Sequence, residues 1–106
     1  MTVDEAIKRL QEQFNPEAAA DLNKTIQFNI TGEEAGKWAM KIADQTCELI
    51  PGGVEKPDLT LSLADKDWIA ISEGKLDAMS AYMTGKLKTT GDIMLAMRIP
   101  NIFALR

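Results

Sequence analysis

Residues 25–31 read Thr25-Ile26-Gln27-Phe28-Asn29-Ile30-Thr31, with an apolar side chain at every second position. This period of two is typical of a β-strand that has one face in a core and the other in water. The same alternation recurs in residues 37–42, 46–50, 59–63 and 86–90. One apolar and one polar face per strand is the pattern of an antiparallel sheet covered on a single side. The sequence therefore predicts five strands with helices packed against one face.

Helices are expected on both sides of these strands in the sequence. Thr2 and Glu5 have the spacing of a capping box, and an apolar stripe at helical spacing continues from there to Phe14. A short second helix is expected over residues 16–22, because proline is favoured in a first helical turn.

The last third of the chain is mainly helical, with helices expected over residues 65–73, 78–84 and 93–98. Asp65 and Asp77 are placed to cap the first two of these helices. Pro100 is expected to end or kink the third near Arg98. The predicted fold class is α+β, a five-stranded mainly antiparallel sheet covered on one face by about five helices.

The composition is that of an ordinary globular domain, and we expect a single domain over residues 1–106. Hydrophobic residues make up 45% and charged residues 26%, with a formal net charge of −4, unlike a disordered chain. The apolar runs are too short for a transmembrane helix, and the acidic N-terminus does not resemble a secretory signal. The single cysteine, Cys47, excludes an intramolecular disulfide and fits a reducing compartment. These features favour a cytoplasmic protein.

Catalysis is not expected from these residue types. The chain contains no histidine, which removes histidine-based acid–base catalysis and most zinc sites. The acid pairs Asp65/Asp67 and Glu33/Glu34 fall at turns or helix starts, where solvation and the helix dipole explain them. The acidic balance also disfavours nucleic acid as a partner. The sequence predicts a protein that is not an enzyme and needs no cofactor or metal ion.

Methionine is concentrated in the last two predicted helices, at Met79, Met83, Met94 and Met97. Flexible thioether side chains suit a pocket that accepts varied apolar ligands. On this pattern alone, the simpler interpretation is that they fill a core. The tail after Pro100 favours the pocket, because joint exposure of Ile102, Phe103 and Leu105 is unfavourable and a lid over an apolar groove would cover them.

One segment carries a more specific pattern, Ser80-Ala81-Tyr82-Met83-Thr84-Gly85-Lys86-Leu87-Lys88-Thr89-Thr90-Gly91-Asp92, continued by Ile93-Met94-Leu95-Ala96-Met97. It is similar to the most characteristic segment of the sterol carrier protein type 2 family. Residues 57–60 and 64–68, and the order of helices and strands, resemble the same family over essentially the whole chain. The resemblance implies helices that enclose an apolar tunnel on the sheet. It also implies non-catalytic binding and carriage of fatty acids, fatty acyl-CoA and sterols.

The resemblance assigns the tunnel lining by position. The sheet wall would be formed by Phe28, Trp38 and Met40. The opposite wall would be formed by Met79, Tyr82, Met83, Met94 and Met97. Two further residues, Ile102 and Phe103, would lie near the mouth. A ligand headgroup at the mouth could pair with a surface residue among Arg9, Asn23, Lys24 and Arg98.

Three classes of function remain open from the sequence. Lipid carriage is favoured over a tethering or substrate-presenting subunit for a lipid-metabolising enzyme, and over an enzyme of unrecognised type. Residues 79–106 carry four basic residues and one acidic residue, which suggests transient contact of this end with an anionic membrane. Peroxisomal members of the family commonly end in a Ser-Lys-Leu-like signal, whereas this sequence ends Ala104-Leu105-Arg106, so a cytoplasmic location is expected.

Overall fold

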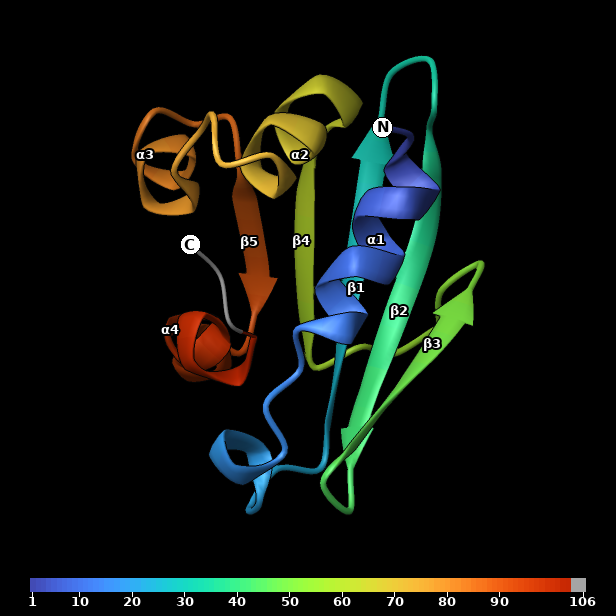
Figure 1. Ribbon diagram of the computed structural model, residues 1–106, viewed down its shortest axis with the longest axis vertical. Coiled ribbons are helices and arrows are strands. Elements are labelled where there is room, and N and C mark those ends of the chain that lie inside the picture. Colours follow the sequence, from blue (N-terminus) through green and yellow to red (C-terminus); the bar gives the residue numbers. More distant parts are fainter. Residues whose placement is uncertain (104–106) are drawn as a thin grey trace.

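The computed structural model describes residues 1–103. The segment Ala104-Leu105-Arg106, which was compared above with a Ser-Lys-Leu-like import signal, lies outside the described residues. One sheet has the strand order β3-β2-β1-β4-β5 (Figure 1). Its strands are β1 (Lys24–Thr31), β2 (Gly36–Ala43), β3 (Thr46–Pro51), β4 (Leu59–Ala64) and β5 (Lys88–Gly91). All five strands lie where the alternation predicted them, with shifts of one or two residues at their ends.

The sheet is mixed, because β1 pairs in parallel with β4 whereas the other three pairings are antiparallel. Phe28 on β1 lies beside Trp38 of β2 on one side and beside Leu61 of β4 on the other. The alternation predicted which face of each strand is covered, and this is correct. It carries no information on strand direction, so the parallel central pair was not foreseen.

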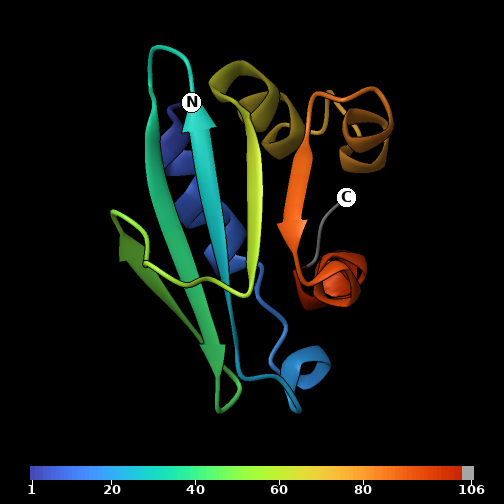
Figure 2. The ribbon, with the colours of Figure 1, turned by 180° about the vertical axis from the view of Figure 1, so that it is seen from behind.

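The four α-helices lie on one face of the sheet, and Figure 2 shows the other face uncovered. They are α1 (Val3–Glu12), α2 (Asp65–Ser72), α3 (Ala78–Met83) and α4 (Ile93–Ile102). The helix expected over residues 16–22 is reduced to one 3-10 turn, η1 (Glu17–Ala19). The described residues therefore hold four α-helices and one turn where about five helices were expected.

Helix α1 closes one half of the sheet, lying across β1 and β2 (Figure 1). Its predicted capping box is present. The Thr2 hydroxyl accepts a hydrogen bond from the Glu5 N–H at 3.1 Å, and the Glu5 carboxylate accepts one from the Thr2 N–H at 2.8 Å. The apolar stripe of α1 is buried against the sheet, at Val3, Ala6, Ile7 and Leu10.

The start of α2 differs from the prediction. Asp65 is the first helical residue and not its cap, and the preceding residue makes no side-chain cap. Its carboxylate instead accepts hydrogen bonds from the N–H groups of Glu34 at 3.1 Å and Lys66 at 2.8 Å. A Cβ on Gly32 would collide with this carboxylate. Asp65 thus fastens the β1–β2 turn to the end of β4.

Helix α4 continues past Pro100 for two residues, so it does not end near Arg98. Ile102 and Phe103 are fully buried. The Asn15 N–H donates a hydrogen bond to the Ile102 carbonyl oxygen at 2.7 Å, and the Phe103 ring lies 6.0 Å from the Phe14 ring. The prediction that Ile102 and Phe103 form a lid at the mouth is wrong, since they close the core beside the end of α1.

Candidate functional site

An apolar groove of about 510 Å³ opens between the helices and the half of the sheet formed by β1, β4 and β5. Its volume is within the range of small-molecule pockets, roughly 300–1,000 Å³. The floor consists of Phe28, Leu61 and Leu63. The period of two places these residues on the covered face of their strands.

Helices α2, α3 and α4 supply most of the walls of the groove, and Leu10 of α1 adds to them. Trp68 belongs to α2, Met79 and Tyr82 to α3, and Ala96 and Met97 to α4. Most of the lining is aliphatic or aromatic, and the part of an apolar ligand that packs against it would lose contact with water.

The two helices at the mouth are held by short polar contacts at their starts. The Asp77 carboxylate accepts a hydrogen bond from the Ser80 N–H at 3.0 Å, which confirms the predicted cap of α3. Asp92 caps α4 in the same way, through the Leu95 N–H at 3.1 Å. Gly91 precedes this cap at a φ of +106°, and a Cβ there would collide with the Asp58 carbonyl oxygen. Only glycine allows the chain to turn so closely from β5 into α4.

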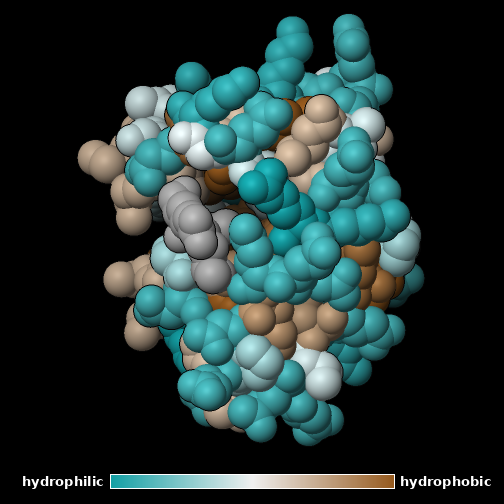
Figure 3. All heavy atoms as spheres, in the orientation of Figure 1, coloured by the Kyte–Doolittle hydropathy of each residue, from teal (hydrophilic) through white to brown (hydrophobic). Residues whose placement is uncertain are grey.

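Large apolar side chains of α3 and α4 stand exposed beside the groove. We call them the apolar rim: Met79, Tyr82, Met83, Ile93, Met94 and Met97. Their exposed fractions lie between 50% and 78%. Figure 3 shows apolar side chains projecting from the left edge of the molecule, where α3 and α4 lie. Contiguous exposed apolar patches of this kind mark surfaces for ligands, partners or membranes.

A second, smaller pocket of about 170 Å³ lies beside the groove. Trp68, Leu10 and Ile71 line both of them. Arg9 and Gln13 of the α1 segment give the smaller pocket a more polar wall. The indole of Trp68 therefore lies where the apolar groove and the polar pocket meet.

Residues 3–104 match the SCP-2 sterol transfer family. This chain belongs to the SCP-2 sterol transfer family. It is 30% identical over 100 residues to human sterol carrier protein 2 and 31% identical over 106 residues to hydroxysteroid dehydrogenase-like protein 2 of Xenopus laevis. Each alignment covers 94% of this chain but only 18% and 24%, respectively, of the relative. The chain thus spans less than a quarter of the length of these relatives.

The fold of this SCP-2 chain is also found among solved structures. The solution NMR structure of palmitated SCP2L2 from Aedes aegypti has a TM-score of 0.82 at 24% identity, over 96% of this chain and 94% of that one. At this identity the likeness concerns the fold alone. The comparisons confirm the family and the α+β class predicted from the sequence.

The structure brings part of the predicted SCP-2 lining together. Four of the ten residues lie on the wall of the groove: Phe28, Met79, Tyr82 and Met97. Met83 and Met94 belong to the exposed rim and not to the wall. They lie on the same helices as the lining methionines but point away from the groove.

The other four predicted lining residues lie elsewhere. Ile102 and Phe103 are in the core, as described above. Met40 is fully buried and Trp38 packs against the core, and neither lines the groove. Both belong to β2, which lies on the α1 side of β1, whereas the groove lies over β1, β4 and β5.

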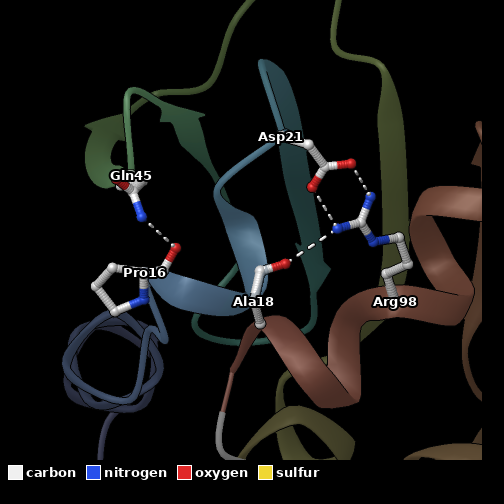
Figure 4. A network of polar contacts seen from close by, with 5 residues as sticks. All are labelled: Pro16, Ala18, Asp21, Gln45 and Arg98. Atoms are coloured by element: carbon white, nitrogen blue, oxygen red, sulfur yellow. Dashed lines mark hydrogen bonds and ion pairs between the residues drawn. The ribbon is translucent and has the colours of Figure 1, made fainter.

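The predicted headgroup residues do not line the groove either. Arg98 clamps Asp21 with two hydrogen bonds of 2.8 and 3.1 Å and donates a third to the Ala18 carbonyl oxygen (Figure 4). This contact lowers the pKa of the Asp21 carboxyl. Lys24 pairs with Asp92 at 3.3 Å.

The two remaining headgroup candidates are also outside the groove. Arg9 lines the smaller pocket, and Asn23 is exposed. Among the described residues that line the groove, Asp77 is the one with a charged side chain.

Sequence reasoning missed the contribution of α2. Trp68 and Ile71 line the groove, although the pattern gave them only as the apolar face of a helix. Ala96 and Pro100 of α4 also line it. The apolar spacing in residues 68–71 was visible in the sequence, but a helix stripe looks the same whether it meets a core or a cavity.

Groups capable of chemistry are sparse in the described part of the chain. Burial raises the pKa of the Cys47 thiol to about 11, so this cysteine stays protonated and unreactive at neutral pH. Residues 1–103 hold no cluster of three side chains suited to a metal ion. No helix within these residues is both long enough and apolar enough to cross a membrane.

Proposed function

We propose that this SCP-2 domain binds lipids with long hydrocarbon parts, such as fatty acids, fatty acyl-CoA and sterols, and carries them without chemical change. The observation that supports this is the 510 Å³ groove with its largely apolar lining. Membership of a sterol transfer family and the fold shared with a palmitated relative point in the same direction.

The energetics of this proposal rest on hydrocarbon burial. Each methylene removed from water contributes about 0.8 kcal/mol, so about ten methylenes contribute roughly 8 kcal/mol. Part of this offsets the loss of freedom on association. Micromolar binding corresponds to about 8 kcal/mol, so against an association cost of about 4 kcal/mol it requires about fifteen buried methylenes, the length of a long-chain lipid. Arg98 and Lys24 are already engaged in ion pairs, which an anionic headgroup would have to break.

The experiment that tests lipid carriage compares the native and denatured masses of the purified protein. We expect excess mass in the native state that disappears on denaturation and matches a fatty acid or sterol. Absence of excess mass, together with no uptake of added long-chain fatty acid, would refute the proposal.

A matched pair of substitutions assigns the uptake to the groove. Ala96→Trp places a bulky ring on the groove wall, whereas Met94→Trp on the same helix places it on the exposed rim. We expect Ala96→Trp to abolish uptake and Met94→Trp to retain it, with both proteins folded by circular dichroism. Equal uptake by the two variants would place the lipid somewhere else.

We further propose that the domain exchanges lipid while in contact with a membrane, in the cytoplasm. The sequence suggested this contact from the basic C-terminal third, but the apolar rim is the stronger feature, since Arg98 is paired with Asp21. Insertion of the rim into a bilayer would give a lipid an apolar path into the groove. Sedimentation with neutral and anionic vesicles tests this: binding to both supports insertion, and binding only to anionic vesicles supports the basic end instead.

A further inference from the structure

The inference concerns Trp68, whose indole Nε1 is fully buried and has no hydrogen-bond partner. It is the one side-chain nitrogen or oxygen of this kind among the described residues. Buried N–H groups in folded proteins are nearly always paired, because an unpaired one loses its hydration without compensation. An unpaired donor at a binding groove is therefore a position at which a ligand oxygen would be favoured.

The residue that carries this donor lines the inner part of the groove. The Trp68 ring packs on Phe28 of the groove floor, with ring centroids 5.4 Å apart. Trp68 is 7% exposed and lines both the groove and the smaller polar pocket. The apolar rim lies on α3 and α4, at the mouth of the same groove. Polarity thus rises inward, from methionine side chains at the mouth to an indole N–H within.

The charge around the groove determines what kind of oxygen fits. No lysine or arginine is among the described residues that line it, and its charged side chain, Asp77, is acidic. Lys24 and Arg98 are held by Asp92 and Asp21. A carboxylate drawn inward would lose its hydration and find no cation among residues 1–103 that line the groove, whereas a hydroxyl or ketone oxygen loses much less.

We propose that Trp68 determines ligand specificity by donating its Nε1–H to a neutral oxygen at the leading end of the lipid. This rests on the proposed lipid-binding function and adds an orientation and a ligand class. The lipid enters oxygen first and leaves its hydrocarbon toward the rim, and long-chain alcohols and ketones are bound in preference to fatty acids. Less than 1 Å² of Nε1 is accessible in this structure, so a neighbouring side chain must rotate before a ligand oxygen can reach it.

The first test observes the donor directly. In ¹⁵N-labelled protein, the indole N–H resonance of Trp68 is followed while decan-1-ol, decanoate or decane is added, decane being supplied through the vapour phase. We expect a downfield shift of the indole proton with decan-1-ol that decane does not produce. The Trp38 indole, outside the groove, serves as the internal control and is expected to stay unchanged.

The second test measures affinity with a matched pair of variants. Trp68→Phe removes the donor but keeps an aromatic ring against Phe28, and Trp38→Phe makes the same change outside the groove. Affinities are taken from the methyl resonances of the groove methionines, which do not depend on tryptophan. We expect Trp68→Phe to weaken decan-1-ol binding about fivefold, the factor that one hydrogen bond supplies. Decane binding and the Trp38→Phe variant are expected to be unaffected.

The outcomes separate this inference from the proposed function. If decan-1-ol and decane both bind but shift the indole equally, or if Trp68→Phe binds both like the wild type, the role of Trp68 is refuted while lipid binding stands. Tighter binding of decanoate than of decan-1-ol would refute the neutral-oxygen preference. If none of the three probes enters the groove, both proposals fail. Because the indole shift is measured on the wild-type protein, a poorly folded Trp68→Phe variant does not prevent the test.

Discussion

The two halves of the sheet carry similar apolar side chains, but one half is covered by a closed core and the other by a groove. Over β1 and β2, the single helix α1 presses Val3, Ala6, Ile7 and Leu10 onto the strands and leaves at most 5% of any of them exposed. Over β4 and β5, helices α3 and α4 leave the groove between themselves and the strands. The difference teaches that apolar content alone does not distinguish a core from a binding site. An apolar helix stripe forms a core where it packs on the sheet, and it lines a groove where it does not.

The largest expected effect compares one methionine from each half. Met40 is fully buried on the closed side, and Met94 is 74% exposed on the open side. We expect Met40→Ala to lower the free energy of unfolding by about 2–5 kcal/mol, because it removes buried atoms and leaves a cavity. Met94→Ala should change it by no more than about 0.5 kcal/mol. Urea denaturation measures both, and similar losses for the two variants would contradict the division into a closed and an open half.

The next prediction concerns the rim. Met83 and Met94 are exposed and do not line the groove, so Met83→Gln/Met94→Gln should leave binding of a dissolved lipid unchanged. Lipid transfer from vesicles should slow about tenfold, because two side chains no longer contribute to insertion and about 1.4 kcal/mol corresponds to a factor of ten. A fluorescent fatty acid transferred from vesicles gives the rate. An unchanged rate would mean that the rim does not enter the membrane.

The features of these halves that depend on local sequence patterns were predicted, whereas those that depend on contacts between distant residues were not. Strand positions and the caps at Thr2 and Asp77 follow from local patterns, and the structure confirms them. The parallel pairing of β1 with β4 is a long-range arrangement that alternation does not encode. The burial of Ile102 and Phe103 likewise depends on contacts with residues 14 and 15.

The groove was predicted only in part for the same reason. Phe28, Met79, Tyr82 and Met97 lie on its wall, and the remaining six predicted residues do not. Helical spacing identifies an apolar stripe but not the direction in which the helix is turned once it docks. Trp68 was therefore overlooked on α2.

A smaller effect is expected from the helix caps. Thr2 caps α1 in the closed half and Asp77 caps α3 in the open half. We expect Thr2→Ala to cost about 1 kcal/mol of global stability, as removal of an N-cap does. Asp77→Ala should instead raise amide hydrogen exchange in α3 with little change in global unfolding, because α3 packs against few neighbours. A large decrease in the global free energy of unfolding of Asp77→Ala would show that α3 belongs to the closed core.

The smallest effect is a pH dependence centred on Asp65. Hydrogen bonds from the N–H groups of Glu34 and Lys66 lower the pKa of its carboxyl in the folded protein. A lowered folded-state pKa gives stability that is present above the unfolded value of about 3.9 and is lost as the pH falls through the folded value. We therefore expect the free energy of unfolding to fall less steeply below about pH 4 in Asp65→Asn than in the wild type. Urea denaturation at pH 7 and pH 3 measures this, and equal acid sensitivity of wild type and variant would assign it to other carboxyls.

The parallel pairing of β1 with β4 has a consequence for how the molecule folds. The hairpins β1–β2 and β2–β3 join neighbours in the chain, whereas the β1–β4 pairing joins strands that both hairpins separate in the sequence. Contacts between distant segments form slowly, because the intervening chain must first be ordered. Until then β1 presents an open edge, which is prone to pairing with other chains.

A bound lipid would act on this late step. A lipid in the groove would touch β1, β4 and the helices that follow β4, and so would favour only the completed arrangement. By mass action, such a ligand would shift the folding equilibrium toward that arrangement and lower the population of chains with an exposed β1 edge, which can aggregate. The cargo of this domain would then also serve as its folding aid, and supply of lipid during synthesis would raise the yield of soluble protein.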